Sequence, residues 1–356
     1  MTVYLWFSDP PGSGIGRYTS TLLDAVEEAA PLHYILSRGK YMEFYRREER
    51  IYGPFSRIMS PMLSVVLDRK IQPRISHSVL SQRDDISVIH YLSQHEAPFR
   101  ASAGIQIATV HDLTTLKGKP ANFTDAIYRR MVASNIKRIF DLENIITVSD
   151  VVRREIDEAG YTGRIHVIHH CASRVFQRKE GKMAIRKRLS LPRDDVILIS
   201  VSTGSQRKNL EMIRQVMKKL GDGYMLIRIG PGLGLSNERD FFNISDDLLN
   251  DLYCASDMLI FPSTSEGFGY PLVEAMATGL PIIALDIPII REIAGDAAIL
   301  LDGFDADALV DAVKANSENL QRLSDISLAR GKSFSFDRFA EQYRDLYSKI
   351  SSRSLS

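Results

Sequence analysis

The sequence has few cysteines, no long hydrophobic run and almost no net charge, and each shortage argues against a class of protein. Only two cysteines, Cys171 and Cys254, occur in 356 residues, so neither a disulfide framework nor a cysteine metal site is expected. No apolar run approaches the roughly 20 residues that span a bilayer. A formal net charge of +1 gives no reason to expect nucleic acid as a partner.

The apolar stretch Met1–Ser8 is too short for a signal peptide and has no basic leader. Together with the scarce cysteines, it predicts a protein of the reducing cytoplasm. Apolar residues make up 44% of the chain and charged residues 25%, which is typical of a globular protein. A length of 356 residues is enough for two domains.

Short β-branched or aromatic runs alternate with amphipathic stretches along the whole chain, which predicts parallel sheets with crossover helices. The pattern restarts after the polar stretch Arg174–Arg193. We therefore expect an α/β protein with two doubly wound, Rossmann-like domains, residues 1–175 and 176–335. The predicted strands are Val3–Phe7, Leu32–Leu36, Val88–Leu92, Ile105–Val110, Ile145–Val148, Ile165–Ile168, Val196–Val201, Met225–Ile229, Met258–Phe261, Ile282–Leu285 and Ala298–Leu301, and helices are expected at Thr19–Glu28, Thr124–Leu142 and Val151–Ala159.

The segment Lys40–Arg83 breaks this rhythm because it has no clear strand and mixes aromatic residues with arginines. We interpret it as an inserted helical excursion whose aromatic rings pack on the first domain. The alternative is an acceptor or membrane-surface element, since basic residues and amphipathic rings suit an anionic interface. The basic stretch Tyr128–Ile139 is interpreted as an ordinary amphipathic helix with a solvated basic face.

The most informative segment is residues 263–281, which follow an apolar strand. Pro271 suits the first position of a helix, where its missing N–H is not needed, and Gly279 suits the position just past the end. Glu266 then lies in the turn before this helix, and Glu274 lies within its first turns. Ligands of parallel sheets bind beyond the carboxyl ends of the strands, so we expect a site here.

The residue types in this turn suit a sugar nucleotide. Gly267 and Gly269 let free backbone N–H groups face an anion, aided by the helix N-terminus. A carboxylate only accepts hydrogen bonds, so Glu274 suits the vicinal hydroxyls of a ribose. Glu266 would then lie near the sugar. The alternative, that both carboxylates merely favour a helix N-terminus, fits the isolated residues but not the whole run.

The spacing Glu266-x7-Glu274 within EGFGYPLVEAMATGLP resembles the signature of the family 4 retaining glycosyltransferases. The resemblance implies a GT-B fold, with two Rossmann-like domains facing a cleft and a C-terminal helix, residues 336–356, crossing back to the acceptor-side N-terminal domain. It implies that Glu274 binds the donor ribose and that Glu266 lies by the sugar. Family members more often have Leu where Tyr270 stands. The donor-binding residues implied by this segment are Gly267, Phe268, Gly269, Tyr270, Leu272 and Glu274.

Two adjacent cations, Arg207 and Lys208, follow another predicted strand in the run VSTGSQRKNL. They could neutralise a departing diphosphate as the glycosidic bond breaks. Many relatives carry a separate arginine several residues before the lysine, whereas Ser202 or Thr203 stands there in this chain, so we expect Arg207 to take that role. The alternative is that both are solvated cations at a helix start.

A glycine loop containing Gly12, Gly14 and Gly16 follows the first predicted strand. Its spacing is GxGxG, not the dinucleotide GxGxxG, and Ser37 and its neighbour offer no acidic group for a ribose at the end of the second strand. These features argue against NAD. The resemblance instead places Gly14, Gly16 and Arg17 beside the donor diphosphate.

The histidines divide into one functional candidate and a group without a metal pattern. The resemblance implies that His111 contacts the transferred sugar, while Asp112 orients the loop; a structural histidine is the alternative. His166, His169 and His170 do not form a zinc site, because alternation along a strand separates 169 from 170. No DxD-like metal motif follows a strand end.

Three further donor contacts are implied by the resemblance: Gly204 in the turn after the strand, and the backbone of Phe242 and Asn243 beside the nucleobase. The function predicted is transfer of a hexosyl unit, mannosyl or glucosyl, from a GDP- or UDP-sugar to an acceptor hydroxyl with retention. His111, Glu266, Arg207 and Lys208 are the catalytic candidates, and the leaving phosphate would accept the acceptor's proton.

No cofactor or metal is required by this mechanism, and the acceptor is expected to be a saccharide or lipid-linked saccharide, with peripheral contact to the inner face of the membrane as an option. Polysaccharide or glycolipid biosynthesis is the expected setting. Two alternatives stay open: a nucleotide-sugar epimerase, which needs no acceptor, and a non-catalytic subunit that binds sugar nucleotides.

Overall fold

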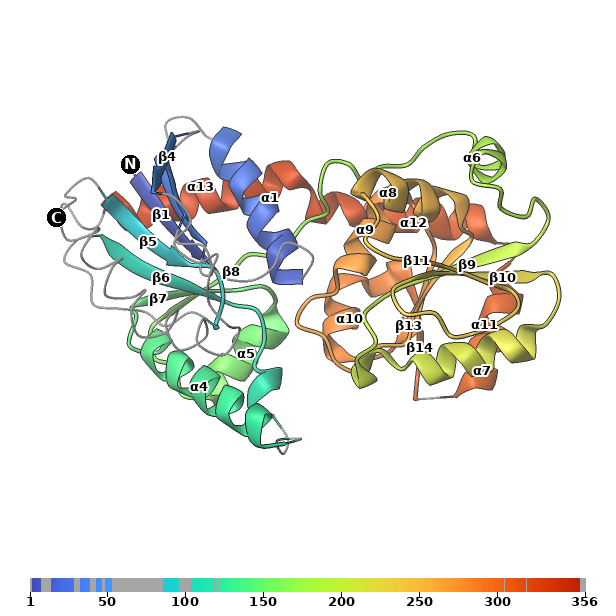
Figure 1. Ribbon diagram of the computed structural model, residues 1–356, viewed down its shortest axis with the longest axis horizontal. Helices are drawn as coiled ribbons and strands as arrows, with labels where there is room; N and C mark the ends of the chain where they lie inside the picture. Colours follow the sequence, from blue (N-terminus) through green and yellow to red (C-terminus); the bar gives the residue numbers. More distant parts are fainter. Residues whose placement is uncertain are drawn as a thin grey trace. The chain divides into compact units, whose positions relative to one another are not determined.

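The computed structural model describes residues 2–7, 14–28, 33–38, 43–46, 49–52, 86–95, 104–117, 120, 122–303, 305–317 and 319–352. The chain divides into two compact units, Met1–His169 with Asp337–Ser356, and His170–Phe336. Each unit has a sheet with helices packed on it (Figure 1). Among the described helices, none is both long and apolar enough to cross a bilayer.

The first unit is built on an eight-stranded sheet with the order β4-β3-β2-β1-β5-β6-β7-β8. The strands from β2 to β8 in this order pair in parallel, as the βαβ pattern predicts. Its strands are β1 (Thr2–Phe7), β2 (His33–Arg38), β3 (Glu43–Arg46), β4 (Glu49–Tyr52), β5 (Ile86–Tyr91), β6 (Ile105–Val110), β7 (Asn144–Thr147) and β8 (Arg164–Val167), and its helices include α1 (Gly14–Glu28), α4 (Phe123–Ile139), α5 (Asp150–Glu158) and α13 (Phe336–Ser352).

Strands β3 and β4 correct the interpretation of Lys40–Arg83. They pair antiparallel with β2 and with each other, so the expectation of no strand is wrong over 43–46 and 49–52. The other residues of that segment lie outside the described ones. The physical reason is that β4 is the edge strand of the sheet and β3 lies next to it, so charged residues are tolerated there and the apolar run of a central strand is not needed.

The second unit has a six-stranded, wholly parallel sheet with the order β11-β10-β9-β12-β13-β14. Helices α7 and α11 cover one face, and α8, α9 and α12 lie on the other (Figure 1). Its strands are β9 (Val196–Val201), β10 (Tyr224–Ile229), β11 (Glu238–Phe241), β12 (Met258–Phe261), β13 (Ile282–Leu285) and β14 (Ala298–Leu301), and its helices are α6 (Lys182–Arg188), α7 (Leu210–Leu220), α8 (Asp246–Ala255), α9 (Tyr270–Thr278), α10 (Pro288–Ile293), α11 (Ala306–Asn316) and α12 (Leu320–Gly331).

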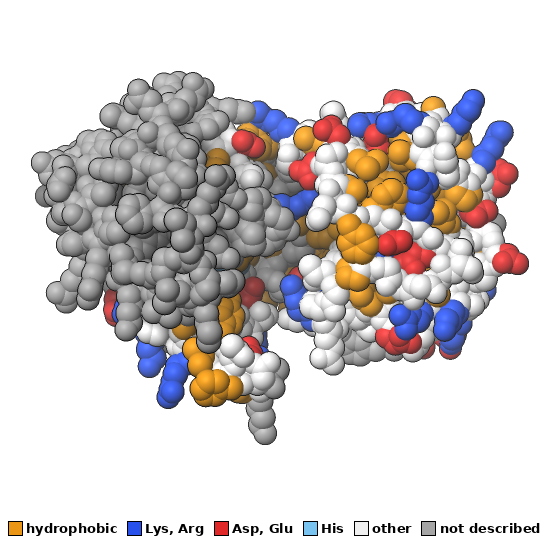
Figure 2. Space-filling model, viewed as in Figure 1, with side chains coloured by type: hydrophobic (Ala, Val, Ile, Leu, Met, Phe, Trp, Pro, Cys, Tyr) orange, Lys and Arg blue, Asp and Glu red, His pale blue; other side chains and the backbone are white. Residues whose placement is uncertain are grey.

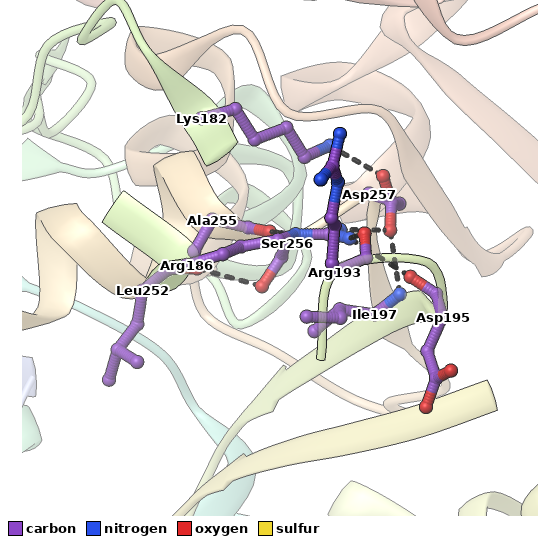
Figure 3. Close-up of polar contacts among 9 residues, drawn as sticks. All are labelled: Lys182, Arg186, Arg193, Asp195, Ile197, Leu252, Ala255, Ser256 and Asp257. Atoms are coloured by element: carbon purple, nitrogen blue, oxygen red, sulfur yellow. Dashed lines mark hydrogen bonds and ion pairs between the residues drawn. The ribbon is translucent and has the colours of Figure 1, made fainter. Parts of the chain in front are cut away.

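A buried ion pair clamps the amino ends of the two central strands β9 and β12 (Figure 3). The Arg186 guanidinium donates to Asp257 Oδ2 over 2.6 Å and to the carbonyl oxygen of Ala255 over 2.9 Å. The same Asp257 oxygen accepts from the backbone N–H of Ile197 in β9 at 2.6 Å, and Lys182 donates to the other oxygen at 2.5 Å. Removing one partner of such a pair leaves a buried charge, so Asp257 fixes α6 and the start of β9 in place.

A buried polar network fixes the C-terminal helix α13 to the first unit. His90 in β5 hydrogen-bonds through Nδ1 with the Tyr347 hydroxyl at 2.7 Å and through Nε2 with Thr109 Oγ1 at 2.8 Å. The Tyr18 hydroxyl in α1 hydrogen-bonds with Thr109 at 3.0 Å and with the Tyr343 hydroxyl at 2.8 Å. Four elements distant in sequence are thereby joined by satisfied polar groups, which favours one packing arrangement over others.

The His90 imidazole predicts a pH dependence of stability. Burial lowers its pKa from 6.5 to about 3, with the charge of His111 a smaller cause. Because the folded-state pKa lies below the unfolded one, the folded chain binds fewer protons between these values, and stability is lost as the pH falls through that window. This group alone should lower the free energy of unfolding by up to about 1.4 kcal/mol per pH unit.

Urea unfolding of the wild type and of His90→Gln, at about pH 7 and about pH 5, measures this effect. The wild type should lose more stability between the two conditions than His90→Gln, which keeps hydrogen-bonding groups but does not titrate. Equal losses would contradict the assignment.

Candidate functional site

The candidate donor site of the second unit is formed at the carboxyl ends of three adjacent strands, β10, β9 and β12. The 3₁₀ turn Gln206–Lys208 follows β9, the turn containing Glu266 follows β12, and Gly230 follows β10. The backbone N–H of Thr264 donates to the carbonyl oxygen of Arg207 over 2.8 Å, which joins the first two turns. The segments that the sequence marks are therefore brought together by strand order.

Glu266 holds both predicted cations. The Arg207 Nη1 atom lies 2.6 Å from Glu266 Oε2 and donates to the carbonyl oxygen of Ser265 at 2.8 Å, while Lys208 Nζ donates to Glu266 Oε1. The Glu266 side chain is only 6% exposed, whereas that of Arg207 is 44% exposed. Burial lowers the pKa of Lys208, an effect that the Glu266 charge opposes. The triad thus presents a half-exposed guanidinium backed by a buried carboxylate.

Glu274 lies inside helix α9, and its carboxylate is almost fully buried. Its Oε2 atom accepts from the Tyr253 hydroxyl at 2.8 Å, so a side chain of α8 fixes its orientation. Helix α9 begins one residue before Pro271, ends at Gly279, and follows Gly269, whose φ of 100° favours glycine. Sequence reasoning found Glu274 but missed Tyr253, whose signal is a polar aromatic residue on the buried face of a helix.

Arg228 is the second residue that sequence reasoning missed. It is the penultimate residue of β10, is fully buried, and donates through Nη1 to the carbonyl oxygens of Ser200 at 3.0 Å and Ile229 at 2.6 Å. Its Nη2 atom donates to the carbonyl oxygen of Ser202 at 2.5 Å and to the Ser202 hydroxyl at 3.0 Å. Burial lowers the pKa of Arg228 to about 10, so the group stays cationic at neutral pH. The available signal was a charged residue within an apolar strand.

His111 follows β6 in the first unit and is buried. Its Nε2 atom lies 2.8 Å from the carbonyl oxygen of Leu92, and since a carbonyl only accepts, Nε2 is the donor. The ring packs edge-on against Tyr18, with centroids 4.9 Å apart. Asp112 Oδ1 accepts from the backbone N–H of Thr114 at 2.9 Å, so this carboxylate closes the turn. The contact of His111 with a sugar stays a prediction.

The glycine loop has a different conformation from the one expected. Gly14, Gly16 and Arg17 lie in the first turns of α1, which starts five residues before the predicted helix at Thr19. The apolar residues Ile15 and Tyr18 already belong to this helix, and Gly16 is buried within it. Gly12 lies outside the described residues. The role of the three described residues at a diphosphate stays a prediction.

The aromatic residues of the donor turn pack on one another. Tyr270 stacks on His170, with ring centroids 5.1 Å apart and planes at 13°, and the ring of Phe268 meets His170 edge-on at 4.9 Å. The side chains of Phe268 and Leu272 are buried. The donor contacts predicted for this segment, which the resemblance assigns to the backbone at Gly267–Tyr270, stay a prediction.

The remaining predicted donor residues lie on loops beside the same sheet. Phe242 directly follows β11 and is exposed, and Asn243 has a left-handed backbone with φ of 48°. Gly204 is an exposed residue of the turn after β9. β11 itself was not predicted, because its sequence Glu-Arg-Asp-Phe is that of a charged edge strand.

Comparison with known proteins places this geometry in a family. The family described as "Glycosyl transferases group 1" matches residues 181–327. The chain is also 26% identical over 337 residues to the O-antigen chain mannosyltransferase RfbU of Salmonella typhimurium, covering 88% of this chain and 89% of that protein. These similarities support a family 4-type glycosyltransferase.

The fold of this chain is shared with solved structures. The sucrose-phosphate synthase of Thermosynechococcus elongatus superposes with a TM-score of 0.76 at 19% identity, covering 98% of each chain. HepE of Anabaena, in complex with UDP-glucose, superposes with a TM-score of 0.70 at 14% identity, covering 98% of this chain and 100% of that one. The predicted GT-B fold is thereby confirmed.

The backbone at Gly230 leaves no room for a side chain, which predicts a large effect of substitution at this position. A Cβ atom at Gly230, which has φ of 122°, would lie 2.1 Å from the carbonyl oxygen of Ser202. We expect Gly230→Ala to lower the free energy of unfolding by roughly 3 kcal/mol or more in urea titrations, because backbone must move. Gly223→Ala is the matched control: φ is 81° but nothing lies within 4 Å, so a loss of about 1 kcal/mol is expected. Equal losses would contradict the close approach.

Proposed function

We propose that this glycosyltransferase transfers a hexosyl unit from a nucleoside diphosphate sugar to an acceptor hydroxyl with retention of anomeric configuration. The observation that carries the proposal is the placement of Arg207 and Lys208 on Glu266 at the carboxyl ends of parallel strands. A mannosyl unit is the first choice, since the relative RfbU is named a mannosyltransferase, and a glucosyl unit is the alternative, since HepE was solved with UDP-glucose.

In the proposed mechanism the two cations stabilise the leaving diphosphate. As the bond between the sugar C1 and the phosphate oxygen breaks, that oxygen gains negative charge, which Arg207 and Lys208 neutralise through charge-assisted hydrogen bonds. The acceptor oxygen forms the new bond to C1, and the leaving phosphate takes the acceptor's proton. Glu266 orients the sugar and keeps both cations in place, while Glu274 binds the ribose. His111 is assigned to the transferred sugar by resemblance alone.

We also propose that transfer needs no divalent metal. Two cationic side chains supply the charge that a metal would otherwise supply to a leaving phosphate. Addition of a chelator should therefore leave the rate unchanged.

Substitutions of the charged residues test the donor site. Lys208→Ala should lower kcat for donor hydrolysis by roughly 10²–10³-fold, because a donor to the developing charge is lost. Glu274→Gln should mainly raise the KM for the donor, roughly tenfold, because an acceptor of ribose hydroxyls is weakened. Release of GDP from GDP-mannose and of UDP from UDP-glucose measures both. Lys218→Ala, on the exposed side of α7, is the matched control and should behave as wild type.

Unchanged rates for both Lys208→Ala and Glu266→Ala would sink this assignment. Incubation with the donor alone also separates the alternatives. A new sugar epimer would indicate an epimerase, and tight donor binding without release of nucleoside diphosphate would indicate a non-catalytic subunit.

We further propose that the first unit contacts a membrane that carries a lipid-linked saccharide acceptor. Apolar side chains are exposed on the start of α4 and just before it, with Phe123 81% exposed. Exposed basic residues, Lys117 and Arg130 among them, lie on the same part of the chain, and Figure 2 shows hydrophobic and basic side chains together there. Apolar side chains within a basic surface suit an anionic bilayer. The exposed apolar residues of this patch are Leu116, Phe123, Ile127 and Tyr128.

Liposome flotation tests the membrane contact. The wild type should float with vesicles that contain phosphatidylglycerol, and the double variant Phe123→Asp/Ile127→Asp should stay at the bottom, because charges oppose insertion. Met183→Asp changes an apolar residue of α6 in the second unit that is as exposed as Ile127, and this variant should float as the wild type does. A wild type that does not float would remove the membrane proposal.

A further inference from the structure

Arg228 occupies a position where the strand composition predicts an apolar residue. β10 reads Tyr-Met-Leu-Ile-Arg-Ile, and the neighbouring Leu226 and Ile227 are fully buried, as is Arg228 itself. Burying a guanidinium costs free energy that its hydrogen bonds repay only in part, and an apolar side chain would often serve stability as well. Packing alone therefore gives no account of this arginine.

The hydrogen-bond partners of Arg228 leave its charge without a bonded anion. The guanidinium donates to three backbone carbonyl oxygens and one hydroxyl, and its Nε atom has no hydrogen-bond partner in the described part of the chain. Glu238 is the anion that acts on it through space. The Glu238 carboxylate is itself engaged by the backbone N–H groups of Leu233 and Leu235.

Arg228 also lies beside the donor site rather than elsewhere in the sheet. Its Nη2 atom bonds Ser202, the first residue after β9, in the turn that leads to Lys208. Gly230, directly after β10, lies close to the Ser202 carbonyl oxygen, so the end of β10 and this turn are in contact. The positive charge of Arg228 acts on Lys208 and, together with burial, lowers the pKa of that lysine. Three cations, Arg207, Lys208 and Arg228, thus lie near two carboxylates, Glu266 and Glu238, which leaves an excess of positive charge suited to a diphosphate.

We propose that Arg228 is a positioning residue for the donor diphosphate. It holds the turn that begins at Ser202 by two hydrogen bonds, and its positive charge adds to the charges of Arg207 and Lys208. Ser202 and Thr203, in the stretch before Lys208, carry no charge. Arg228 of the neighbouring strand β10 then supplies positive charge beside this stretch. This inference rests on the proposed function, because it assumes that the donor diphosphate binds at Arg207 and Lys208.

A ligand series graded by charge separates this role from a structural one. Calorimetric titration of wild type, Arg228→Met and Arg228→Lys with guanosine, GMP and GDP, and with the uridine series, measures the affinity at each charge. Arg228→Met should bind the diphosphate roughly tenfold more weakly, the monophosphate less so, and the nucleoside as the wild type does, since a charge acts in proportion to the charge it meets. Arg228→Lys should restore most of the loss. Ile227→Val, a neighbouring core change without a charge, should leave the gradient unchanged.

Arg228→Met that binds the diphosphate as the wild type does, or that loses affinity equally for all three ligands, would overturn the inference. If Arg228→Met does not fold, Arg228→Gln, which keeps donors without charge, takes its place in the same series. Failure of the proposed function gives another result: the wild type itself shows no gain in affinity with added phosphates, and Lys208→Ala changes nothing.

Discussion

The double ion pair of Glu266 with Arg207 and Lys208 is the interaction on which the rest of the donor site depends. It joins the turns after β9 and β12, two neighbouring strands that carry both sets of candidate site residues. We propose that the carboxylate keeps the cations oriented before an anion binds, so that little reorganisation of the site accompanies the charge that develops on a phosphate.

The same two strands are fixed at their opposite ends by different chemistry. At the amino ends, the buried pair of Asp257 and Arg186 clamps β9 to the segment before β12. At the carboxyl ends, Glu266 bridges the turns, and Arg228 holds one of them from β10. Parallel sheets place ligands at the carboxyl ends, so the proposed donor site and the Asp257 ion pair occupy opposite ends of one pair of strands.

The apolar strands could be predicted from the sequence because burial on both faces leaves near-continuous hydrophobic runs, as in β6 and β9, whose bounds are those expected. The edge strands β4 and β11, and β3 beside β4, could not, since charged residues in the outer strands of a sheet hide the pattern. Motif spacing located Glu266, Lys208 and Glu274. It could not reveal the hydrogen bond from Tyr253 to Glu274 or the one from Arg228 to Ser202, because these contacts depend on which strands and helices pack side by side.

The most direct test of the account is a crystal structure of the chain with the nucleoside diphosphate, GDP or UDP, that it binds. The account predicts phosphate oxygens within hydrogen-bond distance of Lys208 Nζ and the Arg207 guanidinium, with the ribose hydroxyls on the Glu274 carboxylate. A nucleotide whose phosphates lie away from both cations, with its ribose away from Glu274, would contradict it.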